Sequence, residues 1–266
     1  MTGIVRQLEY EVIWSPDVDY EKAPPIHIKT DDFDLGLCGR ELTAALKRDV
    51  ATIDEARSCV EEYLRGWELL IGIREHFDAV RFVYKRAEVE EESVDPEMRQ
   101  RVRHAKSAIE ASADVTAVPH VSRGKYPLPI DPFRVDAIVE AMYSRYRRYQ
   151  DGRELLLSMA NFCLSVLLES SGKEKGKQKR AAAAWKYSID EEVLSKLGNI
   201  CANKGAEYEA RKAPPALSFT PLSQAEEKWV LGVVKAMILR AGELAAVPDK
   251  QHPKIKMLDL PDLGCN

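Results

Sequence analysis

The sequence lacks the features of a membrane or secreted protein. No apolar run approaches the roughly 18 residues that a membrane-spanning helix needs. Residues 1–14 carry acids and alternate apolar with polar side chains, unlike the basic and then apolar regions of a secretory signal. With 45% apolar and 31% charged residues, the chain has the composition of a globular protein. We therefore expect a cytoplasmic protein with no membrane partner.

Cysteine is sparse and is not arranged for metal binding. The five cysteines are scattered, and none forms a CxxC pair, which argues against zinc-ribbon and redox sites. Cys163 and Cys201 fall on apolar helical faces, where we expect small core residues. The acidic run Asp31, Asp32 and Asp34 lacks the glycine and the final glutamate of a calcium-binding loop. We expect no cofactor and no bound metal.

The common catalytic signatures are also missing. The sequence has no phosphate-binding glycine loop, no dinucleotide fingerprint, no HExxH and no GxSxG. Only one of the five histidines, His252, lies after residue 134, so a histidine base within the C-terminal helices is difficult to assemble. These absences leave it uncertain whether the protein is an enzyme.

The N-terminal residues 1–122 have the pattern of a small α+β domain. Alternating apolar residues predict strands over 4–14, 26–29 and 79–91, and helical spacing predicts a long amphipathic helix over 52–75. Residues 95–113 are ambiguous, and 115–120 have the composition of a short strand. Three prolines within 123–133 predict a linker between two halves.

The C-terminal residues 134–266 predict an all-α bundle, so the fold class is α+β. Helical spacing favours four helices, at about 134–149, 153–171, 188–203 and 222–245, with a basic loop and a short helix after the second. The second helix is apolar on nearly every turn, and we expect the others to pack around Met159 and Phe162. Ser188 and Ser223 each precede a glutamate by three residues, which is a capping-box pattern.

Charge is unevenly distributed between the two halves. Residues 1–133 carry a net charge of about −8 and residues 134–266 about +4, which permits an acidic or nucleic-acid partner for the second half. Two basic clusters are candidate nucleic-acid-binding residues: Arg145, Arg147, Arg148 and Arg153, then Lys175, Lys177, Lys179 and Arg180. The alternative, which we favour for the first cluster, has its tyrosines packed inward and its arginines paired with Asp151 and Glu154.

Arg99 and His104 are the candidate catalytic pair. In a metal-independent ribonuclease, histidine would act as acid and base and arginine would stabilise phosphate charge. Positions five apart on a helix diverge by about 140°, so the two would share a site only with some adjustment. The favoured alternative is a solvated basic helix face. The tryptophans are expected to be core or interface anchors: Trp14, Trp67, Trp185 and Trp229.

The stretches RYRRYQDGRELLLSMANFCLSVLLE, YSIDEEVLSKLGNI and PLSQAEEKWVLGVVKAMILRAGE together resemble a bacterial family with HEPN-like helical bundles. Active HEPN ribonucleases carry an Arg–His motif on a late helix, whereas Arg240 here has no histidine four to six residues later. The resemblance therefore implies a binding or scaffolding module. Our leading hypothesis is a non-catalytic interaction module, with a protein partner or a second copy, within a bacterial defence or regulatory complex. The alternative is a HEPN-like ribonuclease or RNA-binding protein.

Overall fold

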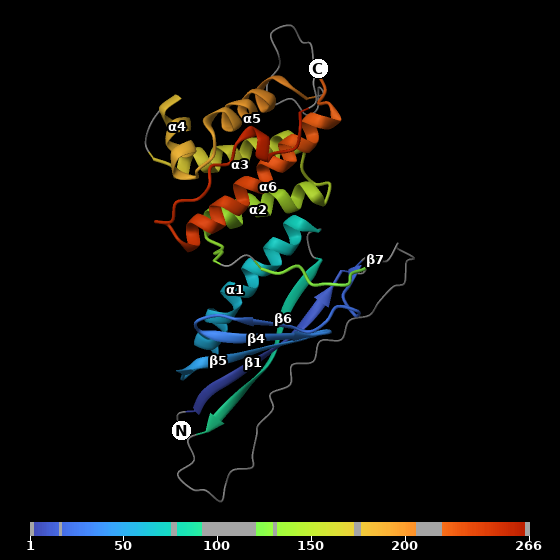
Figure 1. Cartoon of the computed structure of the whole chain (residues 1–266), viewed down its shortest axis with the longest axis vertical. Helices are drawn as coiled ribbons and strands as arrows, with labels where there is room; N and C mark the ends of the chain where they lie inside the picture. The colour runs from blue at the N-terminus through green and yellow to red at the C-terminus, as the bar shows by residue number, and fades with distance from the viewer. Residues whose placement is uncertain are drawn as a thin grey trace, which may run out of the picture. The chain divides into compact units, whose positions relative to one another are not determined.

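The computed structural model describes residues 3–15, 18–75, 79–91, 121–129, 132–172, 177–205 and 220–263. The chain divides into two compact units, residues 1–130 and 131–266 (Figure 1). Among the described residues, the first unit contains the strands and the long helix, and the second unit is helical. This confirms the predicted α+β class, with strands in the N-terminal half and a helical C-terminal half.

An antiparallel five-stranded sheet forms the first unit, in the order β3-β4-β5-β1-β6. Its strands are β1 (Gly3–Trp14), β3 (Ile26–Lys29), β4 (Phe33–Cys38), β5 (Glu41–Val50) and β6 (Val80–Glu91). The helix α1 (Ile53–Arg74) follows β5, and β2 (Val18–Asp19) pairs in parallel with β7 (Val121–Ser122). The predicted strands β1, β3 and β6 and the helix α1 are confirmed.

One face of the sheet and one face of α1 form the core of the first unit. Leu8, Tyr10 and Val12 alternate inward from β1, and Val60 and Trp67 cover them from α1. Thr52 caps α1 by accepting a hydrogen bond from the backbone N–H of Glu55. Figure 1 shows α1 lying against this sheet. The hairpin of β4 and β5 was missed, although buried and exposed residues alternate along β4.

The proline-rich segment 123–129 packs against the first unit. Tyr126 is buried, stacks on Tyr20, and donates its hydroxyl proton to the carbonyl oxygen of Gly39 at 2.8 Å. Trp67 donates its indole N–H to the carbonyl oxygen of Pro127 at 2.7 Å. Of the 123–133 segment predicted to be a linker, residues 123–129 are thus held by the first core.

Five α-helices in the described residues make up the second unit (Figure 1). They are α2 (Ala137–Gln150), α3 (Leu156–Ser170), α4 (Lys177–Lys186), α5 (Glu191–Asn203) and α6 (Gln224–Ala246), followed by the 3₁₀ turn η2 (Met257–Asp259). The helix α3 contacts the other four helices. Met159 is fully buried and Phe162 is half-buried, with the Arg145 guanidinium 4.5 Å above its ring. The predicted central helix is confirmed.

Two details of the second unit differ from the prediction. The helix α5 begins after Asp190, whose carboxylate caps it, and Ser188 lies in the turn before it with a φ of 47°. Beyond the last predicted helix, which ends at about residue 245, Ile255 forms one bridge with Ile189, and η2 follows. The capping box at Ser223 and Glu226 is confirmed.

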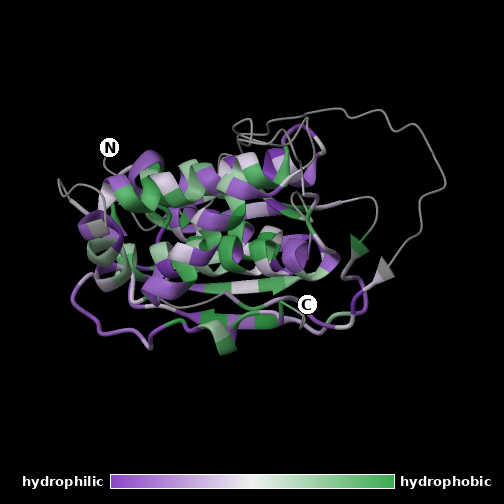
Figure 2. Cartoon of the chain, turned by 90° about the horizontal axis from the view of Figure 1, so that it is seen from above, coloured by the Kyte–Doolittle hydropathy of each residue, from purple (hydrophilic) through white to green (hydrophobic). Residues whose placement is uncertain are grey.

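Hydrophobic and hydrophilic residues are mixed along the helices, as Figure 2 shows. Within the described ranges, none of the helices combines the length and the apolarity that crossing a bilayer requires.

Candidate functional site

Several of the predicted site residues lie outside the described residues. These are the candidate catalytic pair Arg99 and His104, together with Lys175. Lys177 begins α4, while the position of its side chain is not described.

The arginine cluster is placed at the end of α2, where carboxylates neutralise most of it. Arg145 forms an ion pair with Glu154, whose side chain is only 6% exposed, and Arg148 approaches the same carboxylate at 3.9 Å. Arg153 pairs with Asp151, and Arg147 lies half-buried on the last turn of α2. A phosphate group would have to displace these carboxylates. The geometry therefore favours a structural role, which is the alternative preferred from the sequence.

Lys179 and Arg180 belong to helix α4, where a loop was expected. Lys179 pairs with Glu169 on α3. Arg180 lies across Gly198 on α5, and its Nη1 donates to the hydroxyl oxygen of Ser195 at 3.5 Å. Both side chains tie α4 to its neighbouring helices.

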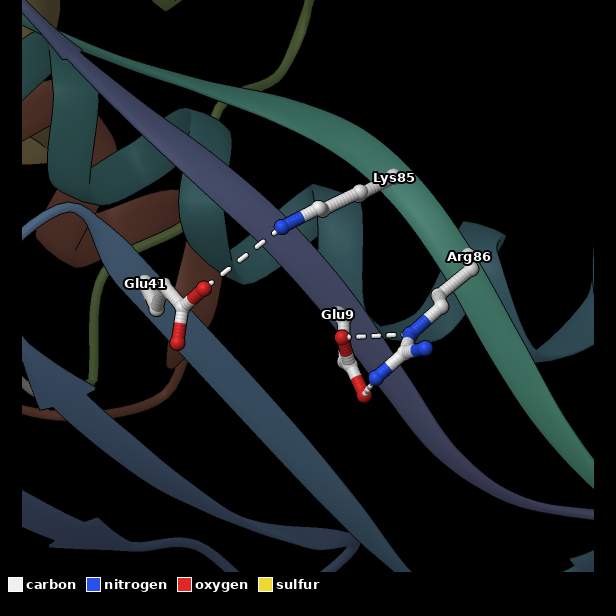
Figure 3. Close-up of polar contacts among 4 residues, drawn as sticks. All are labelled: Glu9, Glu41, Lys85 and Arg86. Carbon is white, nitrogen blue, oxygen red and sulfur yellow. Dashed lines mark hydrogen bonds and ion pairs between the residues drawn. The ribbon is translucent and has the colours of Figure 1, made fainter. Parts of the chain in front are cut away.

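Charged residues on the open face of the sheet also pair with one another (Figure 3). Arg86 donates two hydrogen bonds to Glu9, each 2.7 Å long, which holds the pKa of that carboxyl below its usual value. Lys85 and Glu41 are 3.5 Å apart. Among the residues that the structure describes, no group of three or more His, Cys, Asp or Glu side chains could hold a metal. The two ion pairs on this face link β6 to β1 and to β5 and stabilise the sheet.

The second unit contains a cavity of about 800 Å³, hereafter the Trp185 cavity. The end of α4, the turn before α5, the start of α5, the end of α6 and the segment after α6 form its walls. The lining residues are Ala181, Ala184, Trp185, Lys186, Ser188, Glu191, Leu244, Pro248, Asp249, Lys250, Gln251, His252 and Lys254.

Trp185 is the most unusual residue in this lining. Its side chain is 86% exposed, whereas Trp14, Trp67 and Trp229 are buried in the cores. The tryptophans were predicted to be core or interface anchors. Trp14, Trp67 and Trp229 are core residues, whereas Trp185 is exposed. A sequence signal for this difference exists, since Trp185 follows four alanines on a helix with few other apolar side chains.

A tight turn fixes Trp185 in place. The backbone N–H of Ser188 donates to the carbonyl oxygen of Trp185, and the N–H of Ile189 donates to that of Ala184. This is the Schellman arrangement that ends many helices, and its left-handed position usually holds glycine. Here Ser188 occupies that position, and it is the only non-glycine residue with positive φ in the described ranges. A strained residue thus lies in the cavity wall.

Buried polar groups hold the turn against α6. Arg240, a buried residue of α6, donates to the carbonyl oxygens of Tyr187 at 3.2 Å and Ser188 at 3.0 Å, and also to Glu243 at 2.9 Å. His252 lies 3.5 Å from the same Glu243 carboxylate. These contacts link α6 to Ser188 and His252, two residues that line the Trp185 cavity.

Comparison with known proteins adds no relative: no family model, no curated protein and no solved structure matches this chain.

Proposed function

We propose that this protein is a non-catalytic interaction module that receives a segment of a partner protein in the Trp185 cavity. The observation that carries the proposal is the 86% exposure of the Trp185 side chain on the wall of that cavity. A role within a larger bacterial regulatory or defence assembly forms part of the same proposal.

The physical basis is the free energy available from covering an indole ring. Tryptophan buries on the order of 150–250 Å² when covered, and it is among the residues that most often dominate binding energy at protein interfaces. The hydrogen bonds around Ser188 and Arg240 fix the backbone turn that carries Trp185 before any partner arrives. A preorganised site loses less conformational entropy on binding, so more of the contact energy appears as affinity.

The exposure of Trp185 favours a protein partner over a small molecule. Small-molecule sites generally enclose most of the ligand surface. An indole that projects into solvent from a cavity rim is covered more completely by a broad surface. The RNA-binding alternative has weaker support, because Glu154 and Asp151 already pair with three of its arginines.

A photo-crosslinking residue in place of Gln251, an exposed residue of the cavity lining, tests the proposal. A captured protein would be purified and titrated against the unmodified chain, with acrylamide quenching of tryptophan fluorescence as the readout. Because the other three tryptophans are buried, quenching reports mainly on Trp185. We expect the partner to shield Trp185, and Trp185→Ala to weaken binding about tenfold or more.

Leu258→Ala provides the matched control, because Leu258 is 95% exposed and does not line the cavity. It should leave the affinity unchanged. A partner that binds the Trp185→Ala variant as tightly as the wild type would refute the proposal. Binding of RNA, with shielding of the same indole, would replace it with the nucleic-acid alternative.

A further inference from the structure

We infer that the partner segment is acidic and presents one large apolar side chain to Trp185. This inference rests on the proposed function and adds the chemistry of the partner to it.

The lysines of the cavity carry the first part of the inference. Three of them line it: Lys186, Lys250 and Lys254. Lys250 has no ion pair with any residue that the structure describes, and it is exposed on the turn after α6. Lys254 is about half exposed and lies 3.6 Å from Asp190, a distance at which a second carboxylate can compete. Two ammonium groups are therefore available to carboxylates of a partner.

Two carboxylates of the lining, Glu191 and Asp249, oppose this charge in part. The lining residues alone therefore carry one excess positive charge, with His252 counted as neutral, and Lys254 shares its charge with Asp190 outside the lining. The half of the chain that contains the cavity carries a net charge of about +4. An acidic segment can therefore form ion pairs with Lys250 and Lys254 at the rim.

The apolar part of the lining carries the second part of the inference. Ala181 and Ala184 present small side chains on α4, and Leu244 and Pro248 form the opposite apolar wall. Small residues beside an exposed indole leave room that one large apolar side chain can fill. An acidic segment without such a side chain would leave Trp185 uncovered.

Fluorescent peptides test the partner chemistry directly. Four short peptides are compared: an acidic peptide with a central phenylalanine, the same peptide with alanine instead, and neutral and basic peptides with phenylalanine. Fluorescence anisotropy at low and high salt gives the affinities, and acrylamide quenching reports on Trp185. We expect the acidic phenylalanine peptide to bind about tenfold more tightly than the other three, with an affinity that falls as salt increases.

Charge reversal provides the matched variants. The double variant Lys250→Glu/Lys254→Glu should lose the preference for the acidic peptide and bind the basic one more tightly. The control double variant Lys196→Glu/Lys228→Glu makes the same change in net charge at exposed positions outside the cavity, and it should keep the wild-type preference. Equal effects of the two double variants would overturn a specific role for the cavity lysines.

The outcomes separate this inference from the proposed function. If the acidic, neutral and basic phenylalanine peptides all shield Trp185 equally, the acidic partner is wrong and the interaction site stands. If no peptide shields Trp185, or if only a single-stranded RNA oligonucleotide does, both the acidic partner and the protein-binding site are wrong.

Discussion

At the scale of single residues, two polar groups are held in unfavourable settings. Glu68 of α1 is largely buried, and it accepts a hydrogen bond from the backbone N–H of Phe82 at 2.7 Å. Burial raises the pKa of the Glu68 carboxyl, against the opposing effects of that hydrogen bond and of Arg65. Ser188 is in the left-handed region of backbone conformation. Each residue gives a prediction with a definite sign.

Glu68→Gln should raise the free energy of unfolding at neutral pH. An acid whose pKa is higher in the folded protein destabilises the fold when ionised, and this cost disappears as the pH falls through the raised pKa. The glutamine can still accept the Phe82 hydrogen bond, so that contact is kept. The gain in stability should shrink in acid, because the wild-type carboxyl is then protonated and no longer destabilises the fold. Urea denaturation across pH measures it. A gain that does not depend on pH would contradict the explanation.

Ser188→Gly should stabilise the protein by about 1 kcal/mol, because glycine adopts the left-handed conformation without the steric cost of a Cβ atom. Ser144→Gly is the matched control. Ser144 is exposed in the middle of α2, where glycine should destabilise by about 0.5–1 kcal/mol. Chemical denaturation of both variants gives the comparison. Destabilisation at both positions would show that the turn at Ser188 carries no strain.

At the scale of elements, two chain segments pack on α6: the segment before α2 and the segment at the C-terminal end. A Cβ atom added at Gly242 would lie 2.1 Å from the ring of Phe133, and one at Gly232 would lie 2.6 Å from Pro261. The glycines therefore form flat sites on which the segment before α2 and the C-terminal segment pack. The same helix carries Arg240, which holds the turn at Ser188, and Leu244, which lines the Trp185 cavity.

Gly242→Ala should destabilise the protein by about 1–3 kcal/mol, since the new methyl group overlaps a packed ring. Phe133→Ala in the same chain should relieve the overlap, so the double variant should be less destabilised than the sum of the single changes. Thermal unfolding of the three variants measures this coupling. Strict additivity would indicate that Phe133 does not pack on Gly242.

At the scale of the whole molecule, the described cysteines report on the integrity of the cores. Cys38 is exposed, Cys59 is intermediate, and Cys163 and Cys201 are buried. Burial raises the pKa of the Cys163 thiol to about 12. Because the thiolate is the reactive form, both burial and protonation protect this group.

Alkylation of the native protein should therefore modify Cys38 rapidly and leave Cys163 unmodified until the second unit unfolds. Peptide mapping by mass spectrometry reads each thiol separately. Met159→Ala removes a fully buried side chain that contacts Cys163, so it should cost about 2–5 kcal/mol and shift Cys163 labelling to lower denaturant. Rapid labelling of Cys163 in the native wild type would contradict the structure.

Much of the fold was readable from the sequence because burial repeats along each element. The inward residues of β1, the length of α1 and the central position of α3 follow from period-2 and helical spacing. The hairpin of β4 and β5 was also encoded, in Phe33, Leu35 and Leu37 and in Gly39 with its φ of 56°. It was not predicted because this stretch is rich in aspartate and glycine, which have low strand propensity.

The tertiary structure alone decided the candidate site. The Trp185 cavity brings together residues 181–191 and 244–254, which no local pattern relates. From the sequence, Trp185 resembled the other three tryptophans, and Ser188 had the same capping pattern as Ser223. In the structure, Trp185 is exposed, and Ser188 lies in a strained turn, whereas Ser223 caps α6. Periodicity records which side of an element is buried, but exposure at an element's end depends on which distant segments pack against it.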